Sequence, residues 1–338
     1  MNTTIDTVPT DAAPPDTAPG ATRRVSGAGW RIVARRDMAG HLHSVRFGIL
    51  VGLVVLAGLA AVNAAAGSLR DATEAASSTP SAFLLIFTLS PDRIPSFVDF
   101  FSILGPLLGI AFGFDAIVGE RSQRTLPRLV SQPIHRDDVI VGKFVAGLAT
   151  ISLVTVVVTA VVVAYGMWRV GRAPDGEELT RIVAVVLVSI VYVGLWLGVS
   201  VLASVLTRRA ATAALATLAL WLVFTLFFPL IAGVAADAVS PVDDNDPVTV
   251  VDNARTELRI RRLSPDQLYD EATGVLLNPE QQTTGIVVVR ADSRSLPSIL
   301  GLRESLVLAW WQLFALVALT IVTFVAASVL FLRQEIRA

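Results

Sequence analysis

The sequence contains no cysteine and little charge. Without cysteine, neither a disulfide framework nor a thiolate metal site can form. Charged residues make up 16% of the 338 residues, against roughly 25% in an average soluble domain, while hydrophobic residues make up 54%. A soluble protein of this composition could not cover its apolar surface, so the balance indicates a chain surrounded by lipid. The formal net charge of -1 excludes overall attraction to nucleic acid.

Motifs for nucleotide binding and for metal-dependent catalysis are also missing. No G-x-x-x-x-G-K-[ST] phosphate loop occurs, so the chain cannot bind ATP through that motif. No H-E-x-x-H metalloprotease motif occurs either. His41 and His43 form an isolated pair without the further ligands that a metal site needs. We therefore expect no catalytic residue, no cofactor and no metal site in this chain.

Long apolar runs dominate what is present. Each is near or above the ~20 residues that a helix needs to cross a bilayer, and each avoids a charge at its centre, where one costs about 2.5–3.5 kcal/mol. The runs cover about 47–66, 97–118, 144–168, 182–206, 210–236 and 306–332. They predict an all-α integral membrane protein with six transmembrane helices. The apolar run 82–89 is too short to cross and is interpreted as an interfacial or re-entrant element.

The segments around these runs define the organisation of the chain. Residues 1–28 lack apolar periodicity and are rich in Thr, Ala, Pro and Asp, which predicts a disordered tail. We expect 29–236 to contain an interfacial helix and the first five spans. Residues 237–305 are expected to form a part-helical loop domain, and 306–338 to hold the sixth span and a short tail.

Basic residues are concentrated on one side of the predicted spans, and that side is expected to be cytoplasmic. The short segments of this side carry Arg31, Arg35, Arg36, Arg46, Arg121, Arg124, Arg128, Arg136, Lys143, Arg208, Arg209, Arg333 and Arg337. Both termini are therefore predicted to lie in the cytoplasm, in a multi-pass protein of the cell membrane. The loop 237–305 is predicted to be extracytoplasmic.

An amphipathic helix is predicted before the first span. Its apolar side chains recur at helical spacing as Trp30, Ala34, Met38, Leu42 and Val45. Arg35 and Arg36 lie on the other side, which is typical of a helix along the membrane surface. The alternative is a simple basic anchor that fixes the orientation of the first span.

The charged segment between spans two and three is punctuated by Pro127 and Pro133. These prolines predict a helical extension, a short piece and a new helix start. Such a compact element, held between two spans, is one on which a partner protein can push. The alternative is an ordinary solvated loop.

This segment resembles the corresponding loop of ABC-2 type permeases, the membrane subunits of many ATP-binding-cassette (ABC) transporters. The residues that carry the resemblance are Glu120, Arg121, Thr125, Leu126, Gln132, Pro133, Arg136, Gly142 and Lys143. The topology of six spans is similar over nearly the whole chain, as in permeases with an enlarged loop before the last span. The chain departs from the family at Arg124, where glycine is usual, and at Pro127.

The resemblance implies that 119–136 includes a coupling helix in contact with a separately encoded ATPase subunit. It also implies that two permease subunits, identical or related, assemble in the membrane. Small residues four apart allow close helix packing within or between subunits, and so do not decide the oligomer. These residues are Gly48, Gly52, Gly105, Gly109, Gly113, Gly194 and Gly198.

The loop 237–305 has more acidic than basic residues. A charged helix is expected over 250–263, and Ser264 with Pro265 is typical of the start of a second. A solvated cap over the exit of a transport pathway is the favoured interpretation. Capture of a cation or substrate is the alternative.

The leading functional hypothesis is a permease subunit that forms the translocation path and is driven by a separate ATPase. Export is the expected direction because nothing indicates a docking site for a separate binding protein. A secondary transporter or channel is disfavoured because the spans lack ionisable residues at their centres. A membrane sensor or assembly factor that binds through 237–305 is a third hypothesis.

Overall fold

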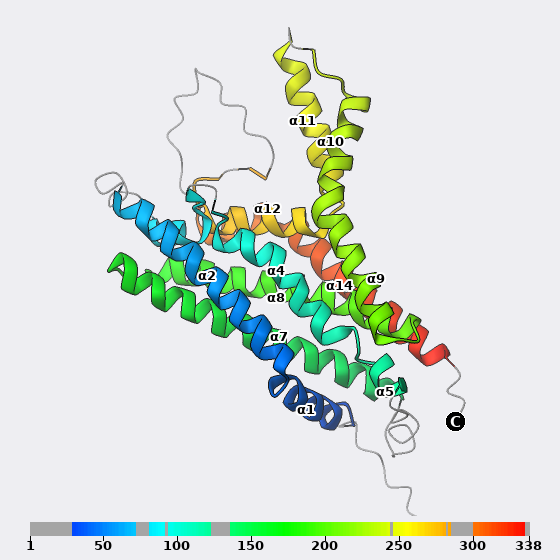
Figure 1. The fold of residues 1–338 in the computed structure, drawn as a ribbon. Coiled ribbons are helices and arrows are strands. Elements are labelled where there is room, and N and C mark those ends of the chain that lie inside the picture. The colour runs from blue at the N-terminus through cyan, green and yellow to red at the C-terminus, as the bar shows by residue number, and fades with distance from the viewer. Residues whose placement is uncertain are drawn as a thin grey trace, which may run out of the picture.

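A computed structural model describes residues 29–71, 81–91, 94–122, 136–243, 246–281, 283–284 and 300–334. Within these residues the secondary structure is helical, without strands (Figure 1). Six helices are long and apolar enough to cross a membrane, which confirms the predicted all-α class with six spans. They are Val45–Leu69, Phe97–Ser122, Arg136–Val170, Gly176–Leu206, Ala210–Val239 and Trp310–Arg333.

The amphipathic segment before the first span forms α1 (Gly29–Leu42), which is separated from α2 (Val45–Asp71) by a short turn. The Ser44 hydroxyl accepts a hydrogen bond from the Phe47 amide at 3.2 Å and so caps the start of α2. Val33 and Ala34 are buried, and α1 packs along α7 (Arg136–Val170). The helix therefore rests on a neighbouring helix over its apolar face.

The centre of the bundle is α8 (Gly176–Leu206), which packs against α4 (Phe97–Gly113), α7 and α14 (Trp310–Arg333). Its Tyr192, Trp196 and Leu197 are almost completely buried. Because most of the second and fourth spans is covered by protein, these helices form the core of the bundle. The fifth and sixth spans remain largely uncovered within this chain.

The fifth span is continuous but changes its helical pitch. It consists of α9 (Ala210–Leu222), a π-helical segment η3 (Val223–Phe227) and α10 (Phe228–Val239). Pro229 has no amide proton to donate to the carbonyl four residues earlier, which favours a widened turn at this place. The helix α11 (Pro247–Arg261) then folds back beside α10, and the two form a projecting hairpin (Figure 1).

The helix α12 (Pro265–Leu277) lies across one end of the bundle, against α4, α8 and α14 (Figure 1). We refer to this end as the α12 end, and to the opposite end, where α1 lies, as the α1 end. Leu268, Tyr269, Ala272 and Leu276 of α12 are almost completely buried. The interpretation of 237–305 as a solvated cap did not include this burial, because the apolar face of α12 is part of the core.

Three shorter elements complete the α12 end. The apolar run 82–89 forms η1 (Ala82–Leu84) and α3 (Leu85–Thr88), whose phenylalanines are buried in the bundle. The helix α13 (Leu302–Leu308) precedes α14. The sixth span therefore begins at Trp310 instead of near residue 306, because Ala309 leaves the helical conformation between the two helices.

Candidate functional site

The candidate site lies at the α1 end, where the second span passes through a turn at 114–117 into the short helix α5 (Val118–Ser122). The hydroxyl of Ser204 on α8 accepts hydrogen bonds from the amides of Ile117 and Val118, at 3.0 and 3.1 Å. These amides would otherwise lack a partner at the start of a helix. Ser204 therefore fixes the start of α5 against the end of α8.

The chain's one lysine forms the centre of the site. Lys143 of α7 is almost buried, and its Nζ lies 2.8 Å from Asp37 Oδ2 of α1 and 3.3 Å from Glu120 Oε1 of α5. A buried ammonium group needs such partners, and removing one member of a buried ion pair strongly destabilises a protein. The ion-pair cluster of Asp37, Glu120 and Lys143 therefore joins α1, α5 and α7.

The neighbouring arginine holds α5 to the other side of the bundle. Arg121 Nη2 donates a hydrogen bond to Gln334 Oε1 at 2.6 Å, and Arg121 Nη1 donates to the Thr207 carbonyl at 3.5 Å. Gln334 Nε2 in turn donates to the Val205 carbonyl at 3.0 Å. The ends of α8 and α14 are thus connected to α5, which lies between the two groups of helices.

A further contact joins the start of α2 to the turn at the end of α4. Arg46 Nη1 donates to Asp115 Oδ2 at 2.7 Å. His41 of α1 packs edge-on against Phe112, with ring centroids 5.1 Å apart. Burial lowers the pKa of His41, against the opposite effect of the carboxylates of Asp37 and Asp115. A neutral imidazole is consistent with this apolar contact.

The side chains of the site connect helices to one another. The described part of this end has charged and amide side chains that connect helices, and it brings no nucleophile and base together at a cavity. Because α5 leads directly into 123–135, a displacement of that segment acts on α5 first. The side chains of Glu120 and Arg121 contact α7, α14 and the residue after α8, and Lys143 extends the connection to α1.

Only some of the functional residues predicted from sequence lie in the candidate site. Glu120 and Arg121 lie in the site, and Arg136 begins α7 with an exposed side chain. Thr125, Leu126, Gln132 and Pro133 lie outside the described residues. On α1, the side chains of Arg35 and Arg36 are exposed, and Trp30 is partly buried beneath Arg31, whose guanidinium carbon is 5.3 Å from the ring centroid.

Comparison with known proteins now assigns the chain to a family. The model of a family described as "ABC-2 family transporter protein" matches residues 31–336. The chain belongs to the ABC-2 transporter family. It is 29% identical over 153 residues to "Probable ABC transporter permease protein NosY" of Stutzerimonas stutzeri, covering 43% of this chain and 52% of that protein. It is 32% identical over 71 residues to the protein of the same name from Pseudomonas aeruginosa, covering 21% of this chain and 26% of that protein.

The match spans about half the length of the first of these relatives and a quarter of the second. The family assignment rests on the much longer match over 31–336. The matched range 31–336 includes the candidate site at the α1 end, the hairpin of α10 and α11, and α12.

The glycines of this ABC-2 transporter have different surroundings. A Cβ at Gly109 would lie 2.6 Å from the Val193 carbonyl oxygen, so α4 and α8 approach closely here. Added Cβ atoms at Gly105, Gly113, Gly194 and Gly198 would also meet atoms of neighbouring helices within 4 Å. No described atom lies within 4 Å of a Cβ added at Gly48 or Gly52, so this face of α2 is open.

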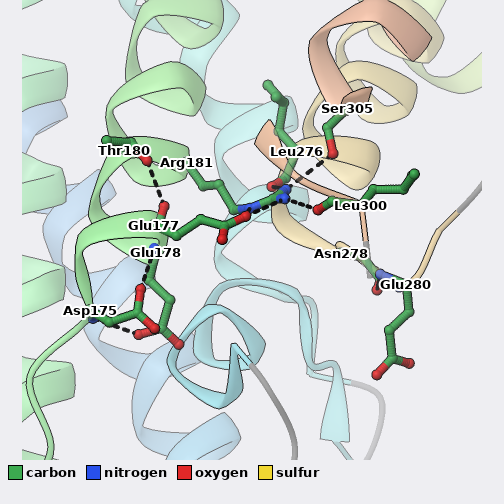
Figure 2. A network of polar contacts seen from close by, with 10 residues as sticks. All are labelled: Asp175, Glu177, Glu178, Thr180, Arg181, Leu276, Asn278, Glu280, Leu300 and Ser305. Carbon is green, nitrogen blue, oxygen red and sulfur yellow. Dashed lines mark hydrogen bonds and ion pairs between the residues drawn. The ribbon is translucent and has the colours of Figure 1, made fainter. Parts of the chain in front are cut away.

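Sequence reasoning missed a buried network that holds α12 to the bundle (Figure 2). Arg181 of α8 is completely buried, and its guanidinium donates to the Leu276 carbonyl at 2.9 Å and to the Ser305 hydroxyl at 3.2 Å. It also donates to the Leu300 carbonyl and forms an ion pair with Glu177 at 2.9 Å. One arginine therefore joins α8 to the end of α12 and to α13.

The other end of α12 is held by a second set of hydrogen bonds. Tyr192 of α8 donates to Asp266 Oδ1 at 2.8 Å, and Thr225 of η3 donates to Asp266 Oδ2 at 2.6 Å. The rings of Tyr192 and Tyr269 are stacked with centroids 4.4 Å apart. Burial raises the pKa of Asp266, although the hydrogen bonds from Thr225 and Tyr192 act in the opposite direction. Burial likewise raises the pKa of Tyr269.

Proposed function

We propose that this chain is the permease subunit of an ABC transporter, forming the translocation path and driven by a separate ATPase subunit. The observation that carries the proposal is the ion-pair cluster of Asp37, Glu120 and Lys143. It gives the segment after the second span a firm connection to two other helices. Membership of the ABC-2 family supports the same function.

In the proposed mechanism, the ATPase contacts the segment 119–136. Binding of ATP brings the ATPase domains together and displaces this segment. Glu120 and Arg121 transmit the displacement, because they connect α5 to α7 on one side and to α14 on the other. The spans then tilt and open the path alternately to the two sides of the membrane. The energy comes from the partner, since this chain has no phosphate loop.

The complete transporter is proposed to contain two permease subunits, identical or related. Only 11% of the most apolar part of the fifth span, 11% of the sixth and 22% of the first are buried in this chain, so broad apolar faces are available for lipid or a second subunit. The open face of α2 with Gly48 and Gly52 is suited to close packing with another helix. We further propose a cell-membrane location with both termini cytoplasmic, and transport in the export direction.

Cross-linking tests the proposed contact. Because the chain contains no cysteine, a cysteine introduced at Arg136 is its only thiol. We expect R136C to cross-link to a co-expressed ABC ATPase that carries a single surface cysteine, in a manner that ATP changes. A cysteine at Arg255, on α11, is the matched control and should not cross-link. Equal cross-linking from both positions would contradict the assigned contact.

Glu120→Ala tests the transmission. In the co-purified complex we expect ATP hydrolysis to persist while coupled transport falls, because Lys143 loses one of its two carboxylates. Glu257→Ala removes a carboxylate on α11, far from α5 in the chain, and serves as the control. An intact complex with undiminished transport after Glu120→Ala would refute the assigned role. Substrate flux in liposomes without any ATPase would instead favour a secondary transporter or channel.

A further inference from the structure

A cavity of about 240 Å³ lies at the α12 end, where α4, η3, the start of α10 and α12 meet. It is separate in the fold from the candidate coupling site, which lies at the α1 end. The π-helical segment contributes Phe224 and Thr225 to its wall. Widened turns of this kind occur frequently at functional sites in helices.

The cavity is lined by more negative than positive charge. Asp99 of α4 and Asp266 and Asp270 of α12 contribute carboxylates, and Arg261 contributes a guanidinium. Arg261 itself lies 3.6 Å from Glu257, so part of its charge is balanced outside the cavity. The two aspartates of α12 are four residues apart and therefore lie on the same face of that helix. The lining favours a cation.

A serine at the start of α12 provides an independent indication of a ligand. Ser264 lines the cavity and is only 3% exposed. Its hydroxyl has no hydrogen-bond partner among the described residues, and it does not cap the helix that it precedes. Buried hydroxyl groups are nearly always hydrogen-bonded, because leaving one without a partner costs about 1–3 kcal/mol. A bound group with hydrogen-bonding capacity would satisfy Ser264.

The rest of the wall is mixed: Ile103, Phe224, Phe228 and Pro229 are apolar, and Ser102, Thr225 and Gln267 are polar and uncharged. Among the described residues, no three His, Cys, Asp or Glu side chains are grouped closely enough to hold a metal ion. Carboxylates beside aromatic rings, without a cluster of ligands, are typical of sites for organic ammonium groups. Cavities of about 150 Å³ in proteins bind benzene, and this cavity is larger. A small amine fits this volume.

We propose that this cavity binds the ammonium group of a small amphipathic amine, with Asp266 and Asp270 facing the charge, Ser264 hydrogen-bonded to the ammonium and the rings of Phe224 and Phe228 covering the apolar part. The same chemistry is available from a free amine and from an amine-bearing lipid headgroup. The site goes beyond the proposed transport function and does not depend on it, since binding requires no ATPase.

The protonation of Asp270 couples this site to pH. Desolvation in the cavity wall is the main cause that raises the pKa of Asp270 to about 7, although the residue is exposed on the surface; the charges of Asp266 and Asp99 act in the same direction, and a hydrogen bond from Ser102 and the charge of Arg261 act in the opposite one. An amine with a pKa near 10 stays charged over this range. Binding should therefore strengthen as pH rises through the pKa of Asp270, because the carboxylate form attracts the ammonium.

The test is equilibrium binding of radiolabelled phenethylamine to the full chain in nanodiscs of phosphatidylglycerol. The uncharged 2-phenylethanol, which has the same number of non-hydrogen atoms, serves as the competitor. We expect phenethylamine to bind and 2-phenylethanol to compete at least about tenfold more weakly, because it lacks the charge that the carboxylates recognise. Asp266→Asn and Asp270→Asn should each weaken binding about tenfold, and Ser264→Ala less.

Asp252→Asn is the matched control, because it removes an exposed carboxylate of α11 that does not line the cavity. Its affinity should stay within about twofold of the parent chain. Equal binding of the neutral competitor would overturn the proposal. So would unchanged affinity in Asp270→Asn and Ser264→Ala with unchanged unfolding temperatures, or an equal loss in Asp252→Asn.

A lipid arm distinguishes the two sources of the ammonium group. If a headgroup occupies the cavity, adding phosphatidylethanolamine to the nanodiscs should weaken phenethylamine binding several-fold, by competition. If the ligand is a free amine, the affinity should not change. Both results support an ammonium site. Loss of ATPase coupling after Glu120→Ala is a separate readout, so failure of this site and failure of the proposed function are distinguishable.

Discussion

Replacing Arg181 by methionine should loosen α12 from the bundle. The guanidinium is completely buried and donates to the carbonyls of Leu276 and Leu300 and to the hydroxyl of Ser305 (Figure 2). Methionine fills a similar volume but donates no hydrogen bond. Each buried acceptor left without a partner costs about 1–3 kcal/mol. Glu177 adds little, because its side chain is 52% exposed and can be hydrated when the arginine is removed.

Together these losses amount to about 3 kcal/mol for the docking of α12. A local opening that is easier by this amount should exchange its amide protons about 100-fold faster. Hydrogen exchange of the amides in 265–277, followed by mass spectrometry in detergent, is therefore the direct assay. The amides of α7 are the internal reference, because the hydrogen bonds of Arg181 go to Glu177, Leu276, Leu300 and Ser305, outside α7.

Arg255→Met provides the matched control for Arg181→Met. Arg255 is 57% exposed and pairs with Asp252, which is 55% exposed. Exposed pairs of this kind contribute about 0–1 kcal/mol, so exchange in α12 should not change. If Arg181→Met leaves the exchange of 265–277 as it is in the parent chain, the buried hydrogen bonds of Arg181 do not hold α12, and the reasoning fails.

Three further predictions concern other parts of the chain. Lys143→Met should lower the free energy of unfolding by about 3 kcal/mol, measured by thermal unfolding in detergent, because it leaves the carboxylates of Asp37 and Glu120 facing each other without a cation. Gly109→Ala should lower the free energy of unfolding by about 1–3 kcal/mol, because the added Cβ would meet the backbone of α8. Gly48→Ala should leave the free energy of unfolding unchanged or raise it, because the added Cβ meets no described atom. Equal effects of the two substitutions would contradict the close packing of α4 on α8. Phenethylamine should bind about fivefold more tightly at about pH 8 than at about pH 6, because Asp270, with a pKa of about 7, is mostly ionised at the higher pH, and Asp270→Asn should reduce this dependence.

The spans were predictable because a single property decides them. A run of about 20 apolar residues has a strong tendency to cross a bilayer whatever it packs against, and the sequence shows six such runs. The helix α1 was predictable from the helical spacing of its apolar residues. The start of α12 was predictable because Ser264 is followed by Pro265, a pair typical of a helix start. The family resemblance followed from the residues between spans two and three.

The contacts of the sites were less predictable, because they join residues far apart in the chain. Nothing local indicates that Lys143 pairs with Asp37, or that Arg121 meets Gln334. Arg181 directly precedes the apolar run 182–206, and nothing in the sequence indicates that the fold buries it. The burial of α12 did have a signal that was missed. Leu268, Ala272 and Leu276 recur at a spacing of four, which is typical of a helix with one apolar face.

The buried position of Lys143 also has a practical consequence for chemical labelling. Amine-directed reagents such as succinimidyl esters need an accessible, unprotonated lysine, and the side chain of the one lysine in this sequence is 6% exposed and held between two carboxylates. Lysine labelling of the folded chain will therefore leave Lys143 unmodified. Appearance of label on Lys143 would then report the separation of α1, α5 and α7 directly, without any engineered probe.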